Sequence, residues 1–283
     1  KNSQEPLFSA ASMLAADFET GQILFSKNDK VPHSIASLTK LMTALVASEI
    51  YHGRVFRITR KALEEYGRYG GLQEGEIFET GELLYPLLLA SDNDAAAALE
   101  LASNGFVSSM NDKARAIGLF STRFADASGL GLQNTSTAED MFKLLKYIFN
   151  DKKPIFDILG LKEYKLVSKN KKVAHTWKNI NWPLGDKRFM AGKVGHTDEA
   201  LETMAGVYKI KLSEGGAPRA VAIVVLHSSD RQKDANKLIK HLEENFVYGN
   251  VLVKKRAPTA PEERPQVIFN EANAYEALQN ISY

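Results

Sequence analysis

The sequence predicts an α+β fold in which strands from both chain ends form one antiparallel sheet. Two short apolar segments, 12–18 and 22–26, flank the turn residues "ETG" and predict a hairpin. Two longer apolar segments, 203–210 and 219–228, lie far along the chain and are separated by a glycine pair. Between the two pairs, apolar residues recur with helical spacing. This order predicts a sheet with flanking helices and an inserted all-helical lobe.

The middle of the chain carries the helix signals. Residues 38–50 place apolar side chains at the i, i+3, i+4, i+7 positions of a buried helix face. Pro86 is expected to bend or shorten the next helix, because proline lacks a backbone N–H. Ser136 and Glu139 have the spacing of a capping box, which predicts a helix start there. The further helical stretches are 82–102, 106–117 and 137–149.

The C-terminal third returns to strands and ends in a helix. Residues 160–190 are polar with scattered aromatics and predict strands and loops. The segment 219–228 is continuously apolar, as expected for a central strand covered on both faces. Asp230 is expected to cap a last helix. The predicted apolar stripe of that helix consists of Ala235, Leu238, Ile239, Leu242 and Phe246.

We therefore expect one domain over residues 1–250. Its sheet lobe would span about 1–57 and 150–250, and its helical lobe about 58–149. Residues 251–283 include "KKRAPTAPEERP", which predicts a proline-rich and charged tail.

Composition excludes several classes of function. The 283 residues carry a net charge of +2 and contain no long basic block, which argues against a nucleic-acid partner. Without cysteine, the chain has no disulfide framework, thiolate zinc site or cysteine nucleophile. The six histidines show no H-x-x-x-H spacing, so we expect no zinc peptidase, metal or cofactor. No apolar run approaches the roughly 20 residues of a transmembrane helix.

Ser37 and Lys40 form the first candidate site. Three residues apart at a helix start, their side chains can touch. Apolar neighbours imply burial, which favours the neutral amine and makes lysine a usable base for a serine hydroxyl. Residues 168–171 repeat the S-x-x-K spacing in a polar stretch, so the spacing alone does not identify a reaction centre.

Ser91-Asp92-Asn93 forms the second candidate site. A polar tripeptide between two apolar segments can present a hydroxyl and an amide into a cleft. The alternative is a helix cap, because Ser, Asp and Asn are favoured there. The third segment is Lys193-Val194-Gly195-His196-Thr197, where the glycine permits close backbone approach of a ligand. Its alternative is a strand end with a solvated lysine.

Together and in this order, the three segments correspond to the S-x-x-K, S-D-N and K-T-G set of penicillin-binding proteins and class A β-lactamases, with valine in place of the threonine. The segments "SIASLTKLMTALVA", "LLLASDNDAAAAL", "DASGL" and "GKVGHTDEA" resemble the low-molecular-mass penicillin-binding proteins, the serine-type D-alanyl-D-alanine carboxypeptidases. The resemblance covers roughly residues 12 to 245. It implies the transpeptidase fold shared by penicillin-binding proteins and β-lactamases.

The resemblance implies a role for each motif residue. Ser37 would be the acylated nucleophile and Lys40 its general base. Ser91 would pass a proton toward the leaving amine, and Asn93 would bind the substrate backbone. Lys193 would supply positive potential for the terminal carboxylate and lower the pKa of the other lysine.

It also implies the substrate and its contacts. The substrate would be a peptidoglycan stem peptide ending in D-Ala-D-Ala, with β-lactams as covalent inhibitors and no cofactor. Substrate contacts would run along Val194, Gly195, His196 and Thr197. The backbone N–H groups of Ser37 and His196 would form the oxyanion hole.

Two residues depart from the family pattern. Val194 stands where relatives have threonine or serine, so a hydroxyl that binds the substrate carboxylate is missing. A hydrogen bond to a charged group contributes about 1–3 kcal/mol. Leu201 stands where relatives commonly have glycine. We therefore expect an active but slow enzyme with impaired β-lactam acylation.

Two rival functions remain. A serine β-lactamase needs a glutamate that activates water, and neither Glu139 nor Glu163 has the matching context. A pseudoenzyme that holds peptidoglycan without cutting it is the other rival, favoured by Val194 and Leu201. The resemblance implies a location in the cell envelope. The chain begins without Met, so we expect a mature or shortened form.

Overall fold

A computed structural model describes residues 6–65, 67, 70–181, 183, 186–212 and 217–245. The predicted tail, 251–283, and Phe246 lie outside these residues. The elements are, in chain order, β1 (Ser12–Asp17), β2 (Ile23–Lys27), β3 (His33–Ser34), η1 (Ala36–Leu38), α1 (Thr39–Ile50), β4 (Val55–Arg57), η2 (Lys61–Glu64), β5 (Ile77–Glu79), α2 (Thr80–Leu89), α3 (Asn93–Glu100), α4 (Phe106–Ala116), β6 (Thr135–Ser136), α5 (Ala138–Asp151), α6 (Lys153–Gly160), β7 (Glu163–Val167), β8 (Ala174–Lys178), β9 (Phe189–Thr197), β10 (Leu201–Ile210), β11 (Arg219–Ser228) and α7 (Arg231–Asn245).

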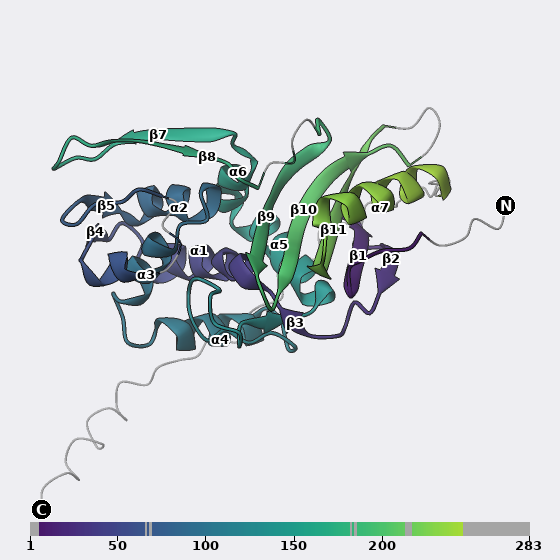
Figure 1. The fold of residues 1–283 in the computed structure, drawn as a ribbon, viewed down its shortest axis with the longest axis horizontal. Coiled ribbons are helices and arrows are strands. Elements are labelled where there is room, and N and C mark those ends of the chain that lie inside the picture. The colour runs from purple at the N-terminus through teal and green to yellow at the C-terminus, as the bar shows by residue number, and fades with distance from the viewer. Residues whose placement is uncertain are drawn as a thin grey trace, which may run out of the picture. The chain divides into compact units, whose positions relative to one another are not determined.

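The main sheet joins both ends of the described chain, as predicted. Its strand order is β2-β1-β11-β10-β9, and every neighbouring pair is antiparallel (Figure 1). In this order β11 is the central strand, with Val224 opposite Leu14 on one side and Ala205 on the other. The α+β prediction and the central position of the continuously apolar segment are thus confirmed.

Helices cover both faces of this sheet. Strand residues alternate between faces, and Ala222, Val224 and Leu226 of β11 belong to the main hydrophobic core. That face packs against α5, whereas α7 packs on β10 and β11 from the other side (Figure 1). Double coverage explains why β11 has no polar alternation from Val221 to Leu226.

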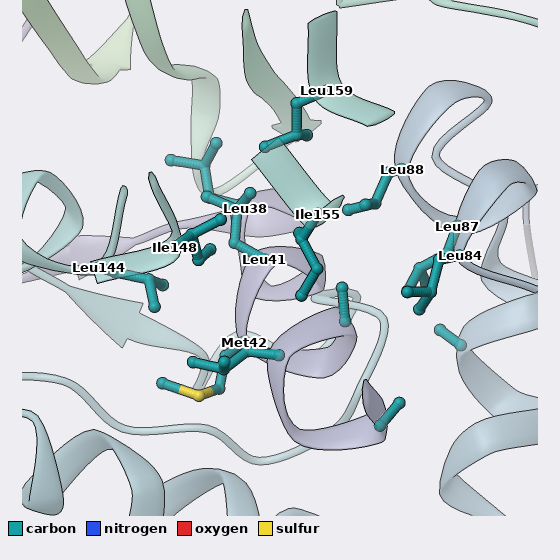
Figure 2. Close-up of a cluster of buried hydrophobic side chains, with 14 of the residues drawn as sticks. Leu38, Leu41, Met42, Leu84, Leu87, Leu88, Leu144, Ile148, Ile155 and Leu159 are labelled. Atoms are coloured by element: carbon teal, nitrogen blue, oxygen red, sulfur yellow. The ribbon is translucent and has the colours of Figure 1, made fainter. Parts of the chain in front are cut away.

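Helix α1 lies inside the core and carries the residues of the first motif. Every side chain from Thr39 to Ala47 is buried, and α1 contacts α2, α3, α4 and α5. A helix that is apolar on all sides needs neighbours all round. Figure 2 shows part of this packing, in which the labelled residues are Leu38, Leu41, Met42, Leu84, Leu87, Leu88, Leu144, Ile148, Ile155 and Leu159.

Two local predictions need correction, the capping box at Ser136 and the single helix over 82–102. The capping box at Ser136 is wrong: Ser136 belongs to β6, and the N-cap is Thr137, whose side chain accepts from Asp140 N at 3.1 Å. The stretch 82–102 is two helices, because "SDN" interrupts it after α2. Pro86 lies inside α2, which ends three residues later at Leu89, and the expected bend or shortening at this proline stays a prediction. Helix α6 was not predicted.

The predicted cap and stripe of the last helix are confirmed within the described residues. Asp230 Oδ1 accepts a hydrogen bond from Lys233 N at 2.9 Å at the start of α7. The stripe residues Ala235, Leu238, Ile239 and Leu242 are buried. Across the described ranges, no helix combines the length and apolar character needed to cross a membrane.

Candidate active site

The junction of η1 and α1 brings Ser37 and Lys40 together. Ser37 lies on the single turn of η1, and Lys40 follows in the first turn of α1. Lys40 Nζ donates to Ser37 Oγ at 3.0 Å. The lysine side chain is fully buried, while Ser37 keeps partial exposure. The hydroxyl can therefore meet a substrate while the amine stays away from water.

Lys40 also connects the first motif with the second. Its Nζ donates to Asn93 Oδ1 at 2.7 Å and to the carbonyl of Ser128 at 2.5 Å. Ser128 belongs to the "DASGL" segment, which is folded around the carboxylate of Asp126. That carboxylate accepts hydrogen bonds from the backbone N–H groups of Ser128, Gly129 and Gly131. The loop thus presents a fixed carbonyl to the amine.

The surroundings of Lys40 favour its neutral form. Burial lowers the pKa of Lys40 from 10.5 to about 7, and the charges of Asp92, Asp126 and Glu65 oppose this shift. The amine can therefore accept a proton near neutral pH, as a general base for the Ser37 hydroxyl must.

Two residues at the site have left-handed backbone conformations. Ala36, immediately before Ser37, has φ = 47°, and Ser91 has φ = 57°. Such values are uncommon for residues with a Cβ atom and concentrate at functional sites. After Ser91, Asp92 caps α3 by accepting from Ala95 N at 3.1 Å. Both alternatives for the second motif therefore hold: Asp92 is a helix cap, and Ser91 and Asn93 face a cavity.

Gly195 allows β9 to approach Ser37 closely. A Cβ atom on Gly195 would stand 2.8 Å from Ser37 N and 2.6 Å from Thr203 Oγ1. The glycine therefore makes room for the backbone of Ser37, and close approach of a ligand along this strand stays a prediction.

Lys193 lies on β9 and is also fully buried. Its Nζ donates to Asn181 Oδ1 at 2.9 Å and to the carbonyl of Val194 at 2.8 Å. Burial and the positive charges of Lys40 and Arg231 lower the pKa of Lys193 well below its usual value. The prediction of a solvated strand-end lysine is wrong.

A cavity of about 230 Å³ collects most of the motif residues. Lys40 and Lys193 are not on its surface and lie behind its wall. The exposed His196 and partly exposed Thr197 form part of the wall, and Thr197 Oγ1 also accepts from Ala200 N at 3.0 Å. The lining residues are Ser37, Gly67, Ser91, Asn93, Gly129, Leu130, Ile180, Val194, Gly195, His196, Thr197 and Arg231.

Arg231 is a cavity residue that the sequence motifs did not indicate. Its Nη1 donates to the carbonyl of Gly195 at 3.2 Å, and it forms an ion pair with Glu202 at 3.5 Å. The arginine begins α7 directly after the central strand. Only the strand order brings this position beside β9, so no local pattern could have identified it.

The described residues offer a general-base site and no metal centre. Within them, no group of three or more His, Asp or Glu side chains has the geometry of a metal site. The arrangement is a hydroxyl next to a buried amine, with a second buried amine and a guanidinium nearby. Such an arrangement suits attack by the hydroxyl on the carbonyl group of a molecule that also carries a carboxylate, because the cationic groups can bind that carboxylate.

Comparison with known proteins agrees with this chemistry. A profile of the D-alanyl-D-alanine carboxypeptidase family matches residues 1–225. A D-alanyl-D-alanine endopeptidase of Pseudomonas aeruginosa is 37% identical over 143 residues, which are 48% of this chain and 46% of that protein. The D-alanyl-D-alanine carboxypeptidase DacD of Escherichia coli is 28% identical over 88% of this chain and 67% of its own length.

Solved structures show the same fold. The DD-transpeptidase of Streptomyces K15 superposes with a TM-score of 0.73 at 26% identity, covering 86% of this chain and 99% of that one. The chain spans about half the length of the endopeptidases that it matches.

Proposed function

The chain belongs to the D-alanyl-D-alanine carboxypeptidase family, and from this premise we propose that it hydrolyses peptides ending in D-Ala-D-Ala through an acyl-serine intermediate. The observation that carries the proposal is the position of Lys40 Nζ, which contacts Ser37 Oγ at 3.0 Å and Asn93 Oδ1 at 2.7 Å. One buried amine thus touches both the nucleophile and the second motif.

Acylation would begin with proton transfer from Ser37 Oγ to neutral Lys40. The Oγ atom then bonds to the carbonyl carbon of the penultimate D-Ala, and the carbonyl oxygen takes the negative charge. The backbone N–H groups of Ser37 and His196 are our candidates for binding this oxyanion, and donors of this kind contribute about 10²–10³ in rate. The tight contact of Gly195 with Ser37 supports the proposal, because it holds the two segments together.

The leaving amine needs a proton before it departs. Lys40 carries the proton taken from Ser37, and Ser91 lines the same cavity. We assign Ser91 to pass that proton to the nitrogen of the terminal D-Ala as the C–N bond breaks. Lys40, neutral again, would then remove a proton from the water that hydrolyses the ester.

The substrate's terminal carboxylate needs cationic partners. Arg231 lines the cavity, and Lys193 lies immediately behind Val194. Val194 offers no hydroxyl, so Arg231 would supply the direct hydrogen bonds and Lys193 a positive potential. Loss of the hydroxyl would slow capture of the carboxylate of a peptide or of a β-lactam by about 10- to 100-fold.

The rival functions have less support. Glu139 pairs with Lys143, and Glu163 pairs with Lys165 on β7. Neither is among the described residues that line the cavity, so neither supports a β-lactamase with a water-activating glutamate. A pseudoenzyme would need neither the contact between Lys40 and Ser37 nor a lowered pKa of Lys40.

Release of D-alanine from a pentapeptide ending in D-Ala-D-Ala tests the proposal. We expect steady release by the wild-type chain and none by Ser37→Ala. Binding of peptidoglycan without release would favour the pseudoenzyme. The substrate class also leads us to propose a location in the cell envelope. The same assay with cross-linked peptides distinguishes a carboxypeptidase, which removes the terminal D-Ala, from an endopeptidase, which cuts cross-links.

A further inference from the structure

One buried amide makes hydrogen bonds to two parts of the site. The side chain of Asn181 is 2% exposed. Its Oδ1 accepts from Lys193 Nζ at 2.9 Å and from Val194 N at 3.0 Å. Its Nδ2 donates to the carbonyl of Leu88 at 2.7 Å and to Asn179 Oδ1 at 2.9 Å. Both donors and both acceptor positions of the amide are therefore used.

These bonds tie β9 to the end of α2. The last carbonyls of a helix lack partners within the helix. Here Asn181 Nδ2 binds the carbonyl of Leu88, and Ile180 N binds that of Leu89 at 3.0 Å. Ser91 follows two residues later. The segment 179–181 thus fixes the third motif relative to the second.

The hydrogen bonds also determine which atom of the amide faces Lys193. Rotating the amide by half a turn would set its NH₂ group against two donors, Lys193 Nζ and Val194 N. It would also set the oxygen against two acceptors, the carbonyl of Leu88 and Asn179 Oδ1. Lys193 therefore meets an uncharged oxygen in a fixed place.

An uncharged partner has a consequence for the charge of Lys193. Its two hydrogen-bond acceptors are both neutral, and the described residues give it no carboxylate within ion-pair distance. A carboxylate in place of the amide would form an ion pair and cancel the positive potential near the cavity.

We propose that Asn181 is a positioning residue, which holds Lys193 behind the cavity wall with a neutral oxygen and so leaves its positive charge to act on the substrate carboxylate. This inference rests on the proposed function. Burial, and after it the positive charges that Arg231 carries and Lys40 can carry, lower the pKa of Lys193, and the terminal carboxylate of a bound substrate would favour its ammonium form again. At Lys40 the pKa is lowered by burial, whereas the negative charges of Asp92, Asp126 and Glu65 raise it.

Asn179 provides a matched control. Its side chain is also buried, at 9% exposed, and its Nδ2 donates to the carbonyls of Leu159 and Leu161. Asn179 contacts Asn181 but has no hydrogen bond to Lys193 among those that the described residues make. Asn179→Ala removes similar buried hydrogen bonds, including one that Asn181 Nδ2 donates, but it leaves Asn181 Oδ1 to Lys193 and Nδ2 to the carbonyl of Leu88.

The test compares two peptides that differ only in the terminal carboxylate. A diacylated lysyl-D-Ala-D-Ala peptide and the same peptide with a C-terminal carboxamide are incubated with each variant, and products are quantified by mass spectrometry. The wild-type chain should prefer the acid. We expect Asn181→Ala to reduce the acid-to-amide ratio of kcat/KM about tenfold, as for a hydrogen bond to a charged group. Asn179→Ala should keep the ratio within about twofold of the wild type.

Each outcome decides a different claim. Equal ratios for Asn181→Ala and Asn179→Ala, with both variants folded, would reduce Asn181 to a structural role and overturn the inference. If Asn181→Ala does not fold, the isosteric Asn181→Asp takes its place: a lowered ratio supports the inference, and a wild-type ratio overturns it. No hydrolysis of the acid peptide by the wild-type chain would overturn the proposed function, and this inference with it.

Discussion

Gly129 packs against the carbonyl oxygen of Ala36, the residue before the candidate nucleophile. A Cβ atom on residue 129 would stand 2.0 Å from that oxygen, and Gly129 has φ = 86°. The carbonyl of the preceding residue, Ser128, binds Lys40. One glycine therefore fixes the distance between the "DASGL" segment and the turn that carries Ser37.

We predict that Gly129→Ala abolishes acylation by a fluorescent penicillin, because either the loop or the η1 turn must move. Gly118→Ala is the matched control: Gly118 has φ = 80°, but its Cβ atom would meet nothing within 4 Å. That variant should lose about 1 kcal/mol of stability through backbone strain and keep its acylation rate. Equal acylation by the two variants would contradict the account.

The pH dependence of acylation follows from the pKa of Lys40. In the proposed mechanism its neutral form is the base, and burial lowers its pKa to about 7. The second-order rate constant for penicillin should therefore rise with pH through about 7 and level off above it. A rate that keeps rising toward pH 10.5, the usual lysine value, would show that the amine stays cationic in the free enzyme.

Protein stability provides an independent measure of the same shift. Between pH 7 and 10.5 the unfolded chain binds a proton at Lys40 that the folded chain does not. The contribution of Lys40 to the free energy of unfolding should therefore increase with pH across that window. Comparing Lys40→Met with the wild type at several pH values isolates this contribution. A difference between them that does not change with pH would contradict the shifted pKa.

Val194→Thr should raise the acylation rate. The new hydroxyl would lie in the cavity wall and could bind the carboxylate of penicillin, a gain of about 10- to 100-fold in rate if the bond is well aligned. Val167→Thr, on the exposed strand β7, controls for a general effect of the substitution. An unchanged or lower rate for Val194→Thr would mean that the missing hydroxyl is not what limits acylation.

Arg231→Leu should weaken substrate capture more than it slows the chemical step. Arg231 is a cation on the cavity surface, so its loss should raise KM for a D-Ala-D-Ala peptide about tenfold. Lys233→Ala, two residues further along α7, should leave KM unchanged. Steady-state kinetics of the three chains provide the comparison, and an unchanged KM for Arg231→Leu would remove the arginine from the binding site.

Local patterns in the sequence predicted most elements of the fold. Apolar patterning is a local property of the sequence. It predicted the strands β1, β2, β10 and β11 and the helix α1, and all five elements were found as expected. The capping prediction failed by one residue because Ser136 and Thr137 are both good N-cap residues. Ser136 pairs with His33 in the two-stranded sheet of β3 and β6, which leaves Thr137 as the cap.

The site residues that belong to short continuous motifs could be predicted from the sequence. Ser37 with Lys40 and Ser91 with Asn93 are local motifs. The structure brings Ser37, Ser91 and Asn93 to one cavity, and Lys40 binds Ser37 and Asn93 from outside its lining. Arg231 and Asn181 were missed because their contacts cross large distances along the chain. Arg231 reaches Gly195 only through the strand order, and Asn181 reaches Leu88 only through tertiary packing.

The measurement closest to the central claim is the intact mass of the chain after incubation with benzylpenicillin, followed by peptide mapping. If neutral Lys40 activates Ser37, one penicilloyl group should be found per chain, attached to Ser37, and none on Ser37→Ala. A chain that stays unmodified while folded, or an adduct on another residue, would contradict the assignment of Ser37 and Lys40.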